Sequence, residues 1–105
     1  MAFTAAFIAH APDADPDKTK ALIETPKYRL FVVVVRDQEQ AMETAKALVA
    51  DEGVQSILLC PGFTNRDVAG LQDAVGDDVG VCVARGDAPS GRIASEVIGR
   101  EWGRG

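Results

Sequence analysis

The sequence predicts a single small α/β domain, residues 1–105, built around a mainly parallel β-sheet. Four apolar runs have the length and composition of strands, at about residues 2–9, 28–35, 54–60 and 79–84, and helix-like segments separate them. The second run contains Leu-Phe-Val-Val-Val-Val without polar alternation, which is typical of a strand buried on both faces. A chain of 105 residues is long enough to form one hydrophobic core without metals or disulfides.

The clearest helix is expected after the second strand. Asp37 is a good N-cap with a Gln three residues later, an apolar stripe follows, and Gly53 ends the segment after Glu52. The next helix is expected up to Val75, with Thr64 or Asn65 as its N-cap.

Two further segments are expected to be helical. The segment from Asp15 to Glu24 predicts a short helix, because Pro16 suits the first helical position and Thr25-Pro26 ends it. Residues 87–105 predict a C-terminal loop and helix tail, in which Ser90 caps a helix that carries an apolar stripe.

The resulting order βαβαβαβ favours right-handed crossovers, with helices on both faces of the sheet. A flavodoxin-like strand order of 2-1-3-4 is expected, and half of a (β/α) barrel completed by a second chain is the alternative. So small a sheet has difficulty covering both faces and both edges, so we expect a homodimer. The alternative is a monomer whose C-terminal tail packs on its own sheet.

Composition excludes several classes of partner. The net charge is −5 and the 11 basic residues are scattered, so nucleic acid and anionic membranes are not expected as partners. No apolar run approaches the ~20 residues that span a bilayer. The N-terminus lacks the basic region of a signal peptide, and the two cysteines do not have zinc-type spacing. We therefore expect a cytoplasmic protein with reduced thiols.

The carboxyl ends of parallel strands meet at one edge of a sheet, where ligands collect. This edge is expected to bring together a histidine, a thiol and two arginines. No other part of the predicted fold combines these groups. The residues concerned are His10, Arg36, Asp37, Cys60, Pro61, Gly62, Phe63, Thr64, Asn65, Arg85 and Asp87.

One interpretation of this edge is catalytic. Cys60 precedes a helix N-terminus, whose dipole favours thiolate, and His10 would serve as base with Asp37 or Asp87 as its orienting carboxylate. A cysteine-dependent hydrolase or isomerase uses side chains of these three types. The alternative is that Cys60 is a small buried hydrophobic residue and that His10 bonds to loop backbone. Cys82, in mid-strand, is expected in the core.

The other interpretation is capture of a small anionic metabolite. Gly62 allows close approach of backbone, and residues 63–66 (Phe63, Thr64, Asn65 and Arg66) open a helix whose free N–H groups favour negative charge. Arg36, Arg66 and Arg85 are candidates to clamp a carboxylate or phosphate. The alternative for these arginines is solvated surface charge.

No cofactor or metal is expected. The chain has neither the Gly-x-x-x-x-Gly-Lys-Ser/Thr of a P-loop nor a Gly-x-Gly-x-x-Gly after a strand. His10 is the only histidine, which excludes a multi-histidine metal site within one chain. The acidic residues 13–17 lack the glycine and distal glutamate of an EF-hand.

The chain resembles a family of short bacterial proteins of about this length with no established function. The resemblance covers nearly the whole chain and rests on Ala5–Ile8, Ala11-Pro12, Ala14–Pro16, Ile23–Pro26, Ala45–Val49 and Cys60-x-Gly62-Phe63. Relatives tend to carry Gly where this chain has Pro61, which stiffens the loop and removes an N–H. The resemblance implies a small α/β fold and a site region at the strand ends, but no activity, cofactor or catalytic residue.

These observations together predict a binding or structural module that holds a small anionic metabolite at the carboxyl ends of the strands. A small hydrolase or isomerase that uses Cys60 and His10 is the alternative.

Overall fold

The computed structural model of the chain describes residues 1–103, which contain five strands and three helices. The strands are β1 (Phe3–His10), β2 (Lys20–Thr25), β3 (Tyr28–Val35), β4 (Ser56–Leu59) and β5 (Gly80–Val83). The helices are α1 (Gln38–Glu52), α2 (Asn65–Val75) and α3 (Ser90–Trp102). All four predicted strands and the three helices predicted after residue 36 are present, with bounds shifted by up to a few residues.

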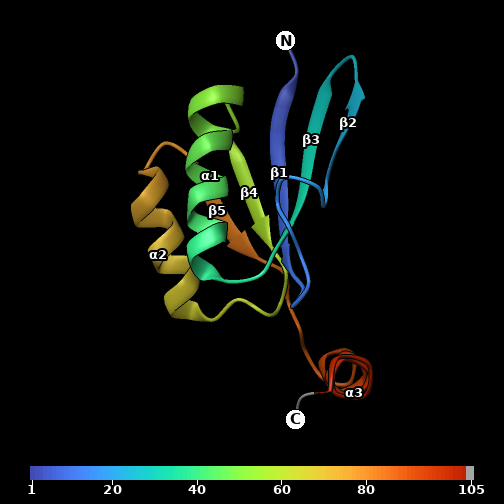
Figure 1. The fold of residues 1–105 in the computed structure, drawn as a ribbon. Coiled ribbons are helices and arrows are strands. Elements are labelled where there is room, and N and C mark those ends of the chain that lie inside the picture. Colours follow the sequence, from blue (N-terminus) through green and yellow to red (C-terminus); the bar gives the residue numbers. More distant parts are fainter. Residues whose placement is uncertain (104–105) are drawn as a thin grey trace.

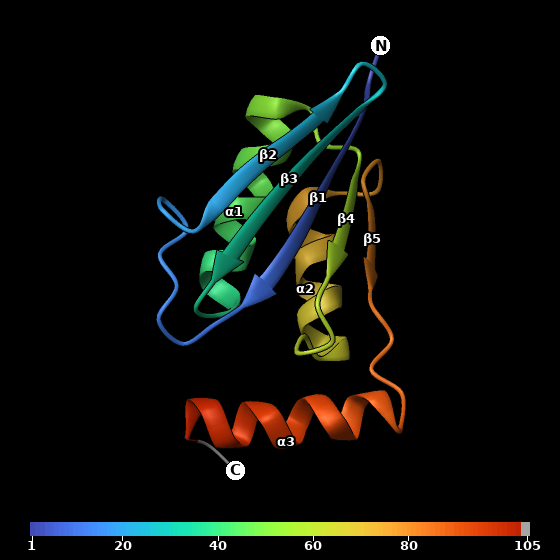
Figure 2. The same ribbon diagram turned by 90° about the vertical axis from the view of Figure 1, so that its right-hand side faces the viewer.

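The strands form one sheet in the order β2-β3-β1-β4-β5 (Figure 2). β3, β1, β4 and β5 are mutually parallel, and they follow the predicted order 2-1-3-4 when the four expected strands are counted along the chain. β2 is antiparallel to β3, so the sheet is mixed and has an edge strand unlike any strand of a (β/α) barrel.

The prediction of a short helix between Asp15 and Glu24 is wrong, because its second half is strand β2. Thr25 pairs with Tyr28, so Pro26 and Lys27 form a two-residue hairpin turn. The apolar residues Ala21, Leu22 and Ile23 suit a strand, and pairing covers the edge of β3 that would otherwise be open.

Helices α1 and α2 begin and end at the residues that the sequence indicates. Asp37 caps α1 by accepting a 2.8 Å hydrogen bond from the Gln40 amide, and Gly53 ends the helix at φ 71°. Thr64 and Asp67 form a reciprocal capping box at the start of α2, with bonds of 3.0 and 3.1 Å.

Both α1 and α2 lie on the same face of the sheet, so the prediction of helices on both faces is wrong (Figure 1). The crossovers β3-α1-β4 and β4-α2-β5 move in one direction across the sheet, and right-handedness puts both helices on one side. The connection from β1 to β3 moves the other way, but it contains β2 instead of a helix. The core under α1 and α2 is formed by Ala6, Ile8, Val33, Val35, Ala41, Ala45, Val54, Ile57, Leu59, Phe63, Leu71 and Val79.

The sheet face opposite α1 and α2, here called the open face, is covered by none of the three helices in residues 1–103 (Figure 2). Large apolar side chains lie on it from three neighbouring strands and from β2, namely Phe3, Phe7, Ile23, Tyr28, Leu30, Val32 and Leu58. Cys82 also lies on this face and is exposed, so its expected place in the core is wrong. The sequence places Cys82 correctly in a strand, but the face it points to has no covering layer.

Helix α3 runs across the carboxyl ends of the strands, away from α1 and α2 (Figures 1 and 2). Ser90 is its first residue and Pro89 its N-cap, without a side-chain capping bond, so the expectation that Ser90 is the cap is wrong. None of its residues is fully buried, and Ile93, Val97 and Trp102 are at least 40% exposed. Within residues 1–103, no helix has the length and apolar character needed to cross a membrane. The last two residues of the predicted tail lie outside the described residues.

Candidate functional site

A cavity of about 360 Å³ lies between the carboxyl ends of the strands and helix α3. This rim cavity is lined by His10, Ala11, Pro12, Arg36, Gly62, Ile98 and Trp102. Three of the predicted site residues, His10, Arg36 and Gly62, therefore meet at one cavity. Its volume is in the range of small-molecule sites, which begin at about 300 Å³.

His10 ends β1 and provides an imidazole that is neutral at physiological pH. Burial lowers the pKa of His10 from its usual 6.5, although the negative charges of Asp67 and Asp37 act in the opposite direction. The ring stacks on Phe63, with centroids 3.9 Å apart and planes inclined by 22°. A neutral, fixed imidazole offers one hydrogen-bond donor and one acceptor to the cavity.

Cys60 and His10 converge on the space beside Gly62. A Cβ atom placed on Gly62 would lie 3.4 Å from His10 Nδ1 and 3.6 Å from Cys60 Sγ, so both atoms border the same small volume. Cys60 is half-buried and is held by its backbone, since its amide donates to the Ile8 carbonyl and its carbonyl accepts from the Phe63 amide. The absence of a side chain at Gly62 keeps this space open.

Arg36 follows β3 and supplies the positive charge of the rim cavity. Its Nη1 donates a 3.0 Å hydrogen bond to the Ala14 carbonyl, which fixes the guanidinium, and its backbone amide donates to Gln40 Oε1. Among residues 1–103, no carboxylate forms a salt bridge with Arg36, whereas Arg29 and Arg85 both have carboxylate partners. The remaining guanidinium donors of Arg36 are available to an anion.

Arg85 lies at a neighbouring cavity of about 470 Å³ and forms an ion pair with Asp87. The two cavities share Gly62 and Ile98. The walls of the neighbouring cavity are Pro61, Gly62, Arg85, Gly86, Ser90, Gly91, Ala94, Ser95 and Ile98. Because the Asp87 carboxylate already neutralises Arg85, this cavity has less attraction for an anion than the rim cavity.

Residues 3–98 match the sequence model of the Family of unknown function (DUF6506). The chain belongs to this family. No curated protein and no solved structure is significantly similar to it. The DUF6506 match includes every predicted site residue, from His10 to Arg85, and extends to Ile98, whereas Trp102 lies beyond it.

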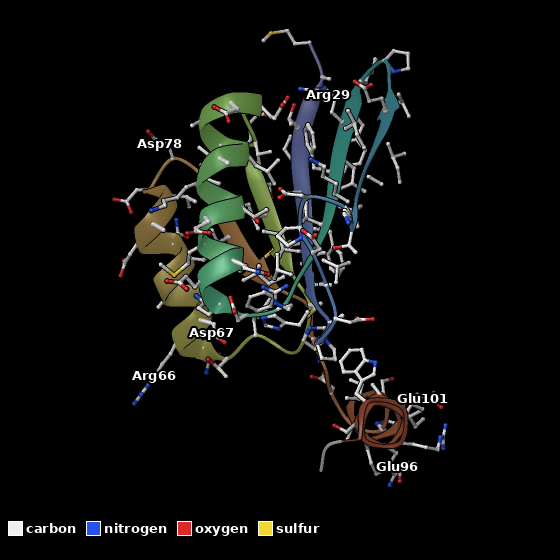
Figure 3. All side chains as sticks on the ribbon, viewed as in Figure 1. Arg29, Arg66, Asp67, Asp78, Glu96 and Glu101 are labelled. Carbon is white, nitrogen blue, oxygen red and sulfur yellow. The ribbon has the colours of Figure 1, made fainter. Side chains whose placement is uncertain are left out.

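The predicted residues at the start of α2 do not reach the cavities of this DUF6506 chain. Thr64 Oγ1 and the Thr64 amide are both used in the capping box, and Asp67 puts a carboxylate in the first turn. Arg66 extends away from the rest of the molecule (Figure 3). Asn65 is exposed beside it, and Phe63 is buried beneath His10. An anion at this helix N-terminus would meet a capped and acidic first turn.

Four residues of the rim cavity in the DUF6506 chain were not among the predicted site residues. Ala11 and Pro12 follow His10 directly, and the other two, Ile98 and Trp102, belong to α3. Their spacing of four residues puts both on one face of α3. The apolar stripe of this helix was a visible signal, but the sequence does not show which part of the fold the stripe faces.

A larger hollow of about 620 Å³ lies beside α1 and the loop before β2, and Arg36 lines it as well. Asp15, Asp17 and Glu43 border it together with Lys20 and Arg36, so its charge is mixed. Within residues 1–103, no group of three or more His, Cys, Asp or Glu side chains is arranged to hold a metal ion. The rim cavity is therefore the best candidate site in this DUF6506 protein.

Proposed function

We propose that this DUF6506 protein is a binding module that, as a homodimer, holds a small anionic metabolite in the rim cavity. The observation that carries this proposal is that Arg36, a positive charge without a carboxylate partner among residues 1–103, lines a cavity with aromatic and aliphatic walls. Catalysis is not required by any residue of the cavity. The free thiols of Cys60 and Cys82 agree with a reducing compartment, and we place the protein in the cytoplasm.

The walls of the rim cavity favour a particular kind of anion. Arg36 offers a planar fork suited to a carboxylate, while Pro12, Ile98 and Trp102 offer apolar surface. A carboxylate with an apolar body satisfies both, whereas inorganic phosphate leaves the apolar walls in contact with water. Neutral His10 donates or accepts one further hydrogen bond without adding charge.

The experiment is a thermal melt in the presence of sodium benzoate, succinate or phosphate, each compared with chloride at equal ionic strength. A ligand at ten times its Kd stabilises the folded chain by ~1.4 kcal/mol, which raises Tm by several degrees. We expect the largest rise with benzoate and no rise in Arg36→Gln. Arg66→Gln is the matched control and keeps the rise, because Arg66 points away from the cavity. A panel of anions without effect on wild-type Tm contradicts the proposal.

A second candidate function is that of a small cysteine-dependent hydrolase or isomerase. The observation in its favour is that Cys60 Sγ and His10 Nδ1 border the same space beside Gly62. In this proposal Cys60 is the nucleophile and His10, neutral because burial lowers its pKa, accepts the thiol proton.

Alkylation separates the two candidates. In a Cys82→Ser background, the enzyme proposal predicts that Cys60 reacts with iodoacetamide at neutral pH much faster than free cysteine does. His10→Phe should slow the reaction while leaving the fold intact. A rate equal to or below that of free cysteine rejects the nucleophile and leaves the binding proposal unaffected.

A further inference from the structure

Among residues 1–103, no charged side chain of the five strands lies on the open face of the sheet. Strand alternation and pairing put Phe3 and Phe7 of β1, Tyr28 and Val32 of β3, and Leu58 of β4 on it. The positions between them on the same face are held by small, aliphatic or hydroxyl side chains and by Cys82. Charged residues make up 26% of the chain, so their absence from a whole sheet face is a specific feature.

The open face is comparable in size to the largest apolar patches on soluble monomers, which are often functional. Contiguous apolar patches on soluble monomers rarely exceed a few hundred Å², and parallel sheets are covered on both faces in nearly all proteins. The Leu-Phe-Val-Val-Val-Val run of β3 has the composition of a strand buried on both sides, yet α1 and α2 cover only one. The sequence is therefore that of a sheet with a second covering layer.

We propose that the open face is an interface between two copies of this chain, packed face to face about a two-fold axis. The available area reaches the lower limit for a biological interface. Five strands that are ~4.8 Å apart and on average ~20 Å long cover ~500 Å² on each copy. The total of ~1,000 Å² is the smallest area expected of a biological interface. A two-fold axis needs one surface that complements itself, and an uncharged apolar sheet face fulfils this condition because it presents no like charges to its copy.

The chemistry of the face favours a second copy over an unrelated partner. Transient partners meet on surfaces about as polar as the rest of a protein, whereas permanent homodimer interfaces are more apolar and resemble a divided core. Phe3 and Tyr28 stack with centroids 5.6 Å apart at one end of the face, which gives a rigid aromatic anchor. The exposed Leu58 and Ile23 lie on the same face, so burial there stabilises the dimer.

Helix α3 of the same chain does not cover the open face. Helix α3 crosses the carboxyl ends of the strands and lines the two cavities there, instead of lying along the sheet (Figure 2). The interface and the rim cavity are thus separate surfaces of one chain. This inference rests on the homodimer of the proposed function and names the surface that forms it.

The test is sedimentation or light scattering of the full chain from low to high micromolar concentration. Wild type is expected at the mass of two chains, each of 11.1 kDa. Leu58→Glu puts a charge on the open face beside Phe7 of the central strand and is expected to give monomers. Ala50→Glu, on the exposed side of α1, adds the same charge elsewhere and is expected to stay dimeric. A wild-type monomer at high micromolar concentration, or a Leu58→Glu dimer, overturns the proposal.

A thiol probe covers the case in which Leu58→Glu does not fold. In Cys60→Ala the only thiol is Cys82, which is exposed in one chain and covered in the proposed dimer. We expect maleimide to label it much more slowly than in the urea-unfolded chain, and a rate equal to that of the unfolded chain overturns the proposal. The anion-induced rise in Tm is measured on the same samples. If wild type is a dimer but anions do not raise its Tm, the proposed ligand is wrong and the interface stands. If wild type is a monomer whose Tm rises with anions, the proposed interface is wrong and the ligand stands.

Discussion

The imidazole of His10 lies flat against the ring of Phe63, with centroids 3.9 Å apart. His10 is the last residue of β1, and Phe63 belongs to the turn between β4 and α2 and is only 5% exposed. The stack therefore joins the end of the central strand to the start of a helix. It also aims one ring nitrogen, Nδ1, at the space beside Gly62.

The buried His10 makes stability depend on pH. Its pKa is lowered by burial in the folded chain, so near pH 6.5 the unfolded chain binds more protons than the folded one. The free energy of unfolding should therefore fall as the pH drops from 7.5 to 6. His10→Phe keeps an aromatic ring on Phe63 but does not titrate, so its urea midpoint should change less over this interval. An equal change in both proteins contradicts the lowered pKa.

Gly62→Ala should fill the shared space without damage to the fold. The added methyl group meets His10 Nδ1 at 3.4 Å and Cys60 Sγ at 3.6 Å, which are ordinary contacts, so stability should stay within ~1 kcal/mol of wild type. Anion binding and alkylation of Cys60 should both weaken, because the methyl group lies between the two side chains. Wild-type values for both would show that the space beside Gly62 has no role.

Neighbouring residues of β4 distinguish the two faces of the sheet. Ile57 is fully buried under the helices, so Ile57→Ala should lower the free energy of unfolding by ~2–5 kcal/mol. Leu58 is 39% exposed on the open face, so Leu58→Ala should have an effect that grows with protein concentration as the dimer forms. Urea titrations at two protein concentrations measure both effects. A concentration-independent loss at Leu58 contradicts the interface.

The capping box of α2 offers a test of the local structure around the site. Thr64→Ala removes the acceptor of the Asp67 amide and should cost ~1 kcal/mol of stability in a urea titration. Thr64→Ser keeps the hydroxyl and should cost much less. Equal losses in both variants would mean that the methyl group of Thr64 and not its hydroxyl stabilises the turn.

The four parallel strands and their order could be predicted because each strand carries a strong local signal. The residues after those strands then meet by topology alone, which is why His10, Arg36 and Gly62 were predicted to lie close together and do border one cavity. Asp37, Thr64 and Gly53 could be assigned as caps from their residue type and position.

The errors have one main origin in the segment between β1 and β3. Pro16 and Thr25-Pro26 give helix-like boundaries, but Ala21–Ile23 pairs with β3, and pairing depends on residues that are distant in sequence. Because a helix was expected there, the second face was expected to be covered. Cys82 was expected in the core because it lies in mid-strand, but its side chain points to that uncovered face. The position of Trp102 could not be predicted either, since it depends on the path of α3 across the strand ends.

The most direct test of the rim cavity uses the only histidine and the only tryptophan of the chain. The indole N–H of Trp102 and the ring signals of His10 are therefore unambiguous in an NMR spectrum, and both side chains line the cavity from different elements. During a titration with millimolar sodium benzoate, both sets of signals should shift with one common Kd, and Arg36→Gln should weaken or abolish the shifts. Signals of Trp102 and His10 that stay unchanged throughout the titration, in a folded wild-type protein, would contradict the proposed site.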